Sequence, residues 1–183
     1  MQAVINAKKM SLTAAVFAVI GFAFVQALAA QVKIPLFFTP VPVTMQTLLV
    51  LLGIVFLEKK AVICQALYIT AGALGAPFFT CGAGPAFLLG PTGGYLFGFF
   101  AASLAVPYVL SKNRTNKKNF VFVFICLFFA LSVIYFFGMV WLKFMLGLSL
   151  KTAFFLGVLP FLPGAAFKLA FASFAGYFYL NRK

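Results

Sequence analysis

The distribution of charged residues limits the fold of this chain most, because it leaves long stretches with no charge. Residues 61–111 carry no acidic or basic side chain, and residues 10–32 and 34–57 carry none either. A spanning helix needs about 20 apolar residues to cross a hydrocarbon core of about 30 Å. Because 65% of the 183 residues are hydrophobic and only 8% are charged, too little polar material remains to cover a water-facing surface. The sequence therefore predicts an integral membrane protein.

The few charged side chains also limit the chemistry. The chain has 14 Lys and Arg residues, a single acid, Glu58, and no His. Acid–base catalysis, catalytic triads and carboxylate metal sites need His or paired carboxylates, so we expect no enzyme, no metal and no cofactor. A phosphate-binding G-x-x-x-x-G-K-[ST] loop is absent, which argues against ATP hydrolysis by this chain. The basic residues are scattered between apolar runs, so we expect no nucleic-acid partner.

The apolar runs predict an all-α bundle of six transmembrane helices in a single domain over residues 1–183. Pro35, Pro40 and Pro42 break the start of the second run, because proline lacks an N–H donor and disfavours helix in the residue before it. The second helix then begins near Val43, is too short to span, and follows a loop that dips into the bilayer. The expected helices cover residues 10–32, 43–57, 61–74, 94–111, 119–142 and 165–181, with a short interfacial helix over 149–157.

The basic residues predict the orientation of this bundle. Six spans place both termini on one side, and cytoplasmic loops carry an excess of Lys and Arg. That excess favours cytoplasmic termini, with the proline-rich loop, the glycine-rich loop and the turn at 160–164 gathered on the outer face as the walls of a pocket. The cytoplasmic side receives Lys8, Lys9, Lys59, Lys60, Lys112, Arg114, Lys117, Lys118, Arg182 and Lys183, and the outer side receives Lys33, Lys143 and Lys151.

Lys168 is the most informative polar residue, because it lies within the last predicted helix. A lysine there costs about 2.5–3.5 kcal/mol on insertion scales and commonly marks a ligand path; the alternative is that its ammonium reaches an interface. Glu58 is expected on the opposite side, so an anionic ligand is the partner that explains the cost. Thr44 and Gln46 open the second helix at its outer end. A Gln amide both donates and accepts, which suits a urea or amide ligand, although both residues could instead cap the helix.

The run Gly90-Pro91-Thr92-Gly93-Gly94 and Tyr95 complete the candidate site. The glycines form either an ordinary turn or a place where backbone approaches a ligand, and Tyr95 could belong to an interfacial aromatic belt. Small residues four apart predict close helix contacts. These pairs are Ala14 with Ala18, Gly94 with Gly98, and Ala172 with Gly176.

Three motifs together resemble the BioY family, the biotin-specific substrate-binding (S) components of energy-coupling factor (ECF) transporters. They are Pro-Val-Pro-Val-Thr-Met-Gln-Thr at 40–47, Gly-Pro-Thr-Gly-Gly-Tyr at 90–95, and Pro-Phe-Leu-Pro-Gly at 160–164 followed by Lys168. The resemblance implies a multi-pass protein of the bacterial cell (inner) membrane that captures biotin at its outer face. It also implies an ECF transmembrane coupling protein and two ATPase subunits as partners, with Ala14 and Ala18 in contact with the coupling protein. It assigns biotin to Thr44, Gln46, Gly90, Thr92, Gly93, Tyr95 and Lys168.

One position departs from that pattern. The family commonly has an Asp three residues before the Lys, where this chain has Ala165. The change removes an acid expected to hold the polar ureido head of biotin. We therefore hypothesise that Lys168 contacts the ligand directly, through the carboxylate or the ureido oxygen of the ligand. The sequence is also compatible with two alternatives: an S component for another small anionic vitamin, and a membrane scaffold that transports nothing.

Overall fold

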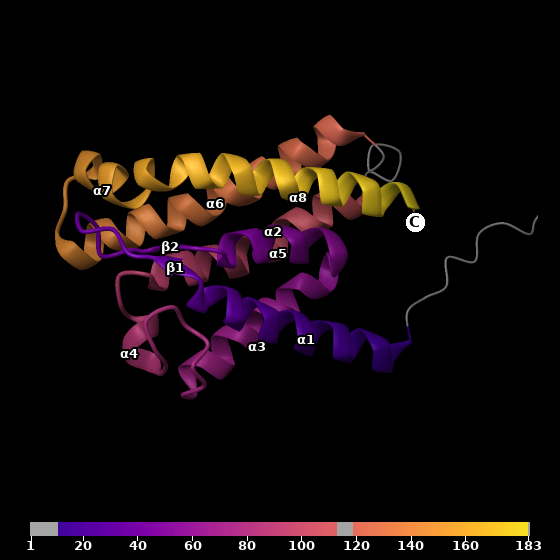
Figure 1. The fold of residues 1–183 in the computed structure, drawn as a ribbon, viewed down its shortest axis with the longest axis horizontal. Coiled ribbons are helices and arrows are strands. Elements are labelled where there is room, and N and C mark those ends of the chain that lie inside the picture. The colour runs from indigo at the N-terminus through magenta and orange to yellow at the C-terminus, as the bar shows by residue number, and fades with distance from the viewer. Residues whose placement is uncertain (1–10, 113–118, 183) are drawn as a thin grey trace, which may run out of the picture.

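The computed structural model describes residues 11–112 and 119–182, which form an elongated bundle of helices (Figure 1). Two short strands and two 3-10 turns interrupt the bundle: β1 (Lys33–Ile34), β2 (Val43–Thr44), η1 (Glu58–Lys60) and η3 (Leu159–Phe161). The α-helices are α1 (Leu12–Gln31), α2 (Gln46–Phe56), α3 (Ala61–Ala73), α4 (Pro85–Leu88), α5 (Gly93–Lys112), α6 (Phe120–Leu146), α7 (Leu150–Gly157) and α8 (Leu162–Arg182).

The lengths and surfaces of these helices suit a bilayer. Within residues 11–112 and 119–182, four stretches are long and apolar enough to cross a membrane, namely α1, α5, α6 and the α7–α8 region. Large apolar side chains point outward along them, with Phe17, Phe144 and Phe167 each at least 70% exposed. Water would penalise such a surface, whereas lipid tails accept it. The fold is therefore that of an all-α, multi-pass membrane protein.

Small residues let the helices approach each other, as the spacing predicts. A Cβ at Gly98 of α5 would lie 2.8 Å from the Cα of Ile134 on α6, and one at Gly94 would lie 2.2 Å from the Cβ of Trp141. A Cβ at Gly176 of α8 would lie 3.1 Å from Val55 on α2. In lipid, the hydrophobic effect does not drive helices together, so the van der Waals contacts of closely packed backbones stabilise the bundle instead. The predicted contacts at Gly94, Gly98 and Gly176 are confirmed.

The predicted start of the second helix is wrong. α2 begins at Gln46, and Val43 and Thr44 instead pair antiparallel with Ile34 and Lys33. Pro40 and Pro42 hold the preceding chain extended, and the β-branched residues after them suit a strand. The ladder gives backbone groups partners that a loop within a bilayer would otherwise lack. With 11 and 13 residues, α2 and α3 are about 16 and 20 Å long.

Two other predicted helix ends also differ from the structure. α6 continues past residue 142 to Leu146 and ends at Gly147, whose φ of +63° favours glycine. α8 begins at Leu162, before the predicted residue 165. Of the turn expected at 160–164, the first two residues lie in the 3-10 turn η3 and the last three are helical. Pro163 fits the first helical turn, where its missing N–H would have no helical partner. The short helix predicted at 149–157 is confirmed as α7.

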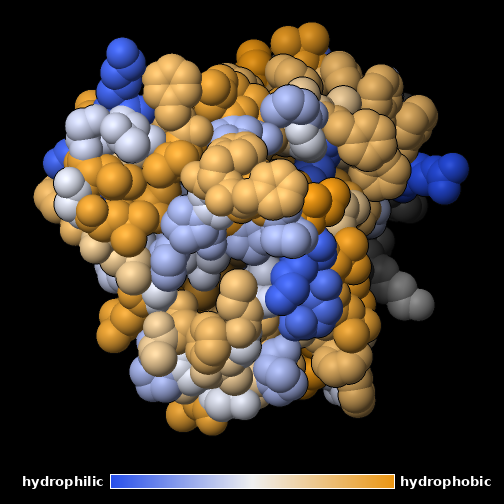
Figure 2. All heavy atoms as spheres, turned by 60° about the vertical axis from the view of Figure 1, so that its left-hand side comes forward, coloured by the Kyte–Doolittle hydropathy of each residue, from blue (hydrophilic) through white to orange (hydrophobic). Residues whose placement is uncertain are grey.

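The irregular segments gather at one end of the bundle, named the hairpin end for its β1–β2 hairpin, α4 and α7 (Figure 1). The C-terminus and the start of α1 lie at the opposite end (Figure 1). Figure 2 brings the hairpin end forward and shows polar residues across its middle, bordered by hydrophobic ones. This gathering agrees with the predicted arrangement. Of the residues used to predict orientation, Lys8, Lys9, Arg114, Lys117, Lys118 and Lys183 lie outside the described residues.

Candidate binding site

A pocket at the hairpin end is built from all three irregular segments and from four of the helices. The space within it is about 550 Å³ when its open mouth is counted. The proline-rich loop, the segment after α3 and η3 all contribute, as the sequence predicts. Its lining comprises Val41, Pro42, Val43, Thr44, Gln46, Thr47, Phe79, Thr80, Thr92, Tyr95, Leu96, Phe99, Tyr135, Phe161 and Lys168.

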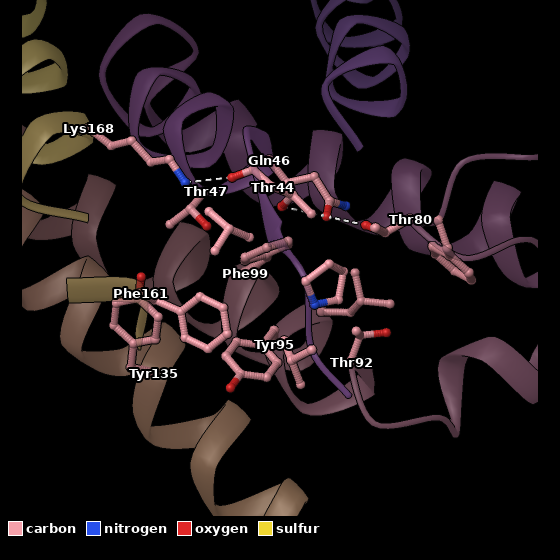
Figure 3. Close-up of a pocket in the computed structure, with 15 residues that line it drawn as sticks. Thr44, Gln46, Thr47, Thr80, Thr92, Tyr95, Phe99, Tyr135, Phe161 and Lys168 are labelled. Carbon is pink, nitrogen blue, oxygen red and sulfur yellow. Dashed lines mark hydrogen bonds between the residues drawn. The ribbon is translucent and has the colours of Figure 1, made fainter. Parts of the chain in front are cut away.

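Lys168 lies inside this pocket and does not reach an interface. Its side chain is only 6% exposed and extends from α8 toward the first loop, where Nζ donates to the carbonyl oxygen of Thr44 at 2.5 Å (Figure 3). An ammonium has three N–H donors, so this bond leaves two for a ligand. Glu58 lies beyond the far end of α2, so the only acid of the chain is remote from the pocket.

Gln46 is held by its neighbours. Its Oε1 accepts hydrogen bonds from the hydroxyls of Thr44 at 3.1 Å and Thr80 at 2.7 Å. Its Nε2 donates to the hydroxyl of Tyr68 at 2.6 Å, and that hydroxyl donates to the carbonyl oxygen of Phe78 at 2.6 Å. The amide oxygen therefore has both acceptor positions filled. At most one N–H of Gln46 remains for a ligand, and the main effect of the residue is to fix Thr44 and Thr80.

An aromatic wall closes the side of the pocket formed by α5, α6 and η3. Tyr135 stacks on Phe161 with ring centroids 6.2 Å apart and planes at 17°, and both rings meet Tyr95 edge-on. The hydroxyl of Tyr95 donates to the carbonyl oxygen of Gly157 at 2.6 Å. Tyr95 therefore presents its ring, and not its hydroxyl, to the pocket (Figure 3). The wall suits the flat, apolar part of a small solute.

Two predicted glycines lie behind the pocket surface. The carbonyl oxygen of Gly90 accepts a hydrogen bond from Nε1 of Trp141 at 2.9 Å. A Cβ at Gly93 would lie 1.9 Å from the carbonyl oxygen of Leu88, so that position must be glycine for the loop to close. These glycines shape the loop that presents Thr92. Thr44, Gln46, Thr92, Tyr95 and Lys168 do line the pocket.

Sequence reasoning missed Thr47, Thr80, Tyr135 and Phe161. Phe161 belongs to the quoted Pro-Phe-Leu-Pro-Gly segment, and its place in the pocket could have been inferred from that motif. Tyr135 stands in an apolar helix that is rich in Phe, where no spacing signal separates it from the surrounding aromatic residues.

The small residues predicted to face a partner lie on the outer surface of α1. Ala14 is exposed and Ala18 is partly buried. They lie one helical turn apart, so they share one face of the helix. That face is separate from the binding pocket.

The fold and the pocket define a class of protein: a multi-pass helical membrane protein with a partly open pocket at one end. The sequence profile of the BioY family matches residues 2–182. The chain belongs to the BioY family, and membership places it among transport components and not among enzymes.

Individual proteins agree with this assignment. A probable biotin transporter BioY of Pyrococcus horikoshii is 34% identical over 159 residues, covering 86% of each chain. One of Lysinibacillus sphaericus is 38% identical over 102 residues, which cover 55% of this chain and about half (51%) of that protein. A crystal structure of the S component for biotin from an ECF-type ABC transporter superposes with a TM-score of 0.84 at 22% identity. The match covers 93% of this chain and 92% of that one.

Proposed function

We propose that this protein is the biotin-binding S component of an ECF transporter, which captures biotin at the hairpin end for import. The observation that carries the proposal is the buried ammonium of Lys168, which lies with two free donors in a pocket walled by aromatic rings. Biotin combines an anionic carboxylate and a polar cyclic urea with an apolar ring and chain. The names of this chain's relatives point to the same ligand.

Ligand-dependent thermal unfolding of the purified protein tests this function. A ligand at 100 times its dissociation constant stabilises the folded state by about 2.7 kcal/mol. Biotin is expected to raise the unfolding temperature, while thiamine and riboflavin leave it unchanged. A rise with another anionic vitamin but not with biotin would assign the protein to that vitamin. No rise with any of them would favour a scaffold without a solute.

We further propose six passes through the bacterial cell membrane, with both termini in the cytoplasm. They are made by α1, α2 together with the extended segment before it, α3, α5, α6 and α8. The distribution of basic residues supports this orientation. Lys59, Lys60, Lys112 and Arg182 belong to one end of the bundle, and Lys33, Lys143 and Lys151 belong to the hairpin end. The hairpin end would then face the outside of the cell, where the solute arrives.

A natural cysteine reports this orientation. Cys81 is exposed on the loop between α3 and α4, whereas Cys64 and Cys126 are buried. A membrane-impermeant maleimide is expected to label the protein in intact cells, and Cys81→Ser is expected to abolish the labelling. Labelling that appears only after the cells are opened would place the hairpin end in the cytoplasm.

We also propose that Ala14 and Ala18 contact the ECF transmembrane coupling protein, which binds two ATPase subunits. Their small side chains on an accessible face of α1 permit close helix approach. The double variant Ala14→Phe/Ala18→Phe is expected to bind biotin as wild type does, yet no longer to purify with the coupling and ATPase subunits. Ser132→Phe, on the exposed surface of α6, serves as the control. If the double variant still purifies with these subunits as wild type does, the coupling protein contacts another surface.

A further inference from the structure

The hydroxyl of Tyr135 has no hydrogen-bond partner within the part of the chain that the structure describes. The side chain is only 9% exposed and lines the pocket. Two other buried phenols differ: Tyr68 and Tyr95 each donate to a main-chain carbonyl at 2.6 Å. The phenol oxygen of Tyr135 is not fully buried, so it can be reached from the pocket. The phenol of Tyr135 is therefore free to bond with what occupies the pocket.

The pocket holds more free donors than strong acceptors. The ammonium of Lys168 only donates, and Oε1 of Gln46 already accepts two hydrogen bonds. No carboxylate is among the described lining residues. A ligand with N–H groups must then find its acceptors among main-chain carbonyls and the hydroxyls of the lining residues. These hydroxyls belong to Thr44, Thr47, Thr80, Thr92 and Tyr135. Figure 3 shows Tyr135 on the same side of the pocket as Lys168 and opposite Thr92.

The ring of Tyr135 is fixed in place, which makes its hydroxyl a defined acceptor. Phe161 stacks on it and Tyr95 meets it edge-on. These two contacts restrain the ring, so little rotational freedom remains to be lost when a ligand binds. A pre-positioned acceptor discriminates strongly, because a ligand lacking the matching donor leaves it unpaired.

We propose that Tyr135 is a specificity-determining residue whose phenol oxygen accepts a hydrogen bond from a ureido N–H of the ligand. This inference rests on the proposed function, because biotin carries a cyclic urea with two N–H donors and one carbonyl acceptor. The site therefore favours cyclic ureas over apolar carboxylates of similar length, which offer no N–H.

Titration calorimetry with two ligands tests the assignment. Tyr135→Phe removes only the hydroxyl, and it is expected to weaken biotin binding by about tenfold. Biotin methyl ester keeps the ureido ring but lacks the carboxylate charge, so the variant is expected to weaken ester binding by about the same factor. Tyr108→Phe removes an exposed phenol from α5 and is expected to bind both ligands as wild type does. Ligand-free unfolding temperatures check that the variants fold equally.

The possible outcomes distinguish the role of Tyr135 from the proposed function of the protein. Wild-type affinity of Tyr135→Phe for biotin would overturn the role of Tyr135 and leave the proposed function standing. A loss confined to biotin and absent with the ester would assign the phenol to the carboxylate and overturn the ureido contact. Failure of the wild-type protein itself to bind biotin would overturn the proposed function. If Tyr135→Phe is less stable than wild type, Tyr135→Trp serves as a second variant and is expected to bind both ligands more weakly. Wild-type affinity of Tyr135→Trp would refute the proposal.

Discussion

Replacing Lys168 with Met is expected to weaken biotin binding by at least about a hundredfold. Met keeps an apolar stem of similar length but lacks the ammonium, so the change removes the cation with little change in packing. Hydrogen bonds to charged groups contribute about 1.5–3 kcal/mol, and an anionic ligand would also lose its counter-charge in a desolvated pocket. A hundredfold loss corresponds to about 2.8 kcal/mol.

The same variant separates binding from folding. Burying an ammonium is costly, so Lys168→Met is expected to unfold at a temperature no lower than that of the wild type. Lys151→Met, which removes an exposed cation of α7, is expected to keep wild-type affinity. Binding isotherms and thermal unfolding of the three proteins make the comparison. If Lys168→Met binds biotin with an affinity within threefold of wild type, the ammonium does not contribute to biotin binding.

Breaking the amide pair between α1 and α3 is expected to have the largest effect on stability. Gln26 and Gln65 are at most 1% exposed and exchange two hydrogen bonds of 2.9 and 2.8 Å. Gln26→Leu leaves the amide of Gln65 buried without its partner, which costs about 1–3 kcal/mol. We expect the free energy of unfolding to fall by about that amount.

The double variant Gln26→Leu/Gln65→Leu is the matched control. Removing both amides leaves no unpaired group, and interhelical hydrogen bonds in membranes contribute only about 0.6 kcal/mol on average. Its stability is therefore expected to return close to that of wild type in reversible unfolding in detergent. If the double variant loses as much stability as the single variants Gln26→Leu and Gln65→Leu lose together, packing and not pairing matters at these positions.

Sequence patterns located the helices and the pocket because they depend on local chemistry. Charge-free runs mark segments that lipid accepts, and Lys168 stands out because an ammonium in such a run needs an explanation. The start of α2 was missed because the pairing of Val43 with Ile34 joins residues across a loop, which helical periodicity does not reveal.

The polar groups of the site were harder to infer. The sequence left open whether the amide of Gln46 binds ligand or caps the helix. In the structure, neighbouring side chains occupy most of the amide. Whether a buried polar group is free depends on which side chains the fold brings beside it. For the same reason, Tyr135 could not be distinguished from the other aromatic residues of α6 before its neighbours were known.

The hydrogen bonds around Gln46 bear on how solute enters. Thr80 donates to Gln46, and its carbonyl oxygen accepts from Nζ of Lys33 at 2.7 Å. Each bond joins the first loop or the start of α2 to the segment after α3. Drawing these two segments apart would break both bonds together. We therefore expect the two segments to separate cooperatively when the entrance opens.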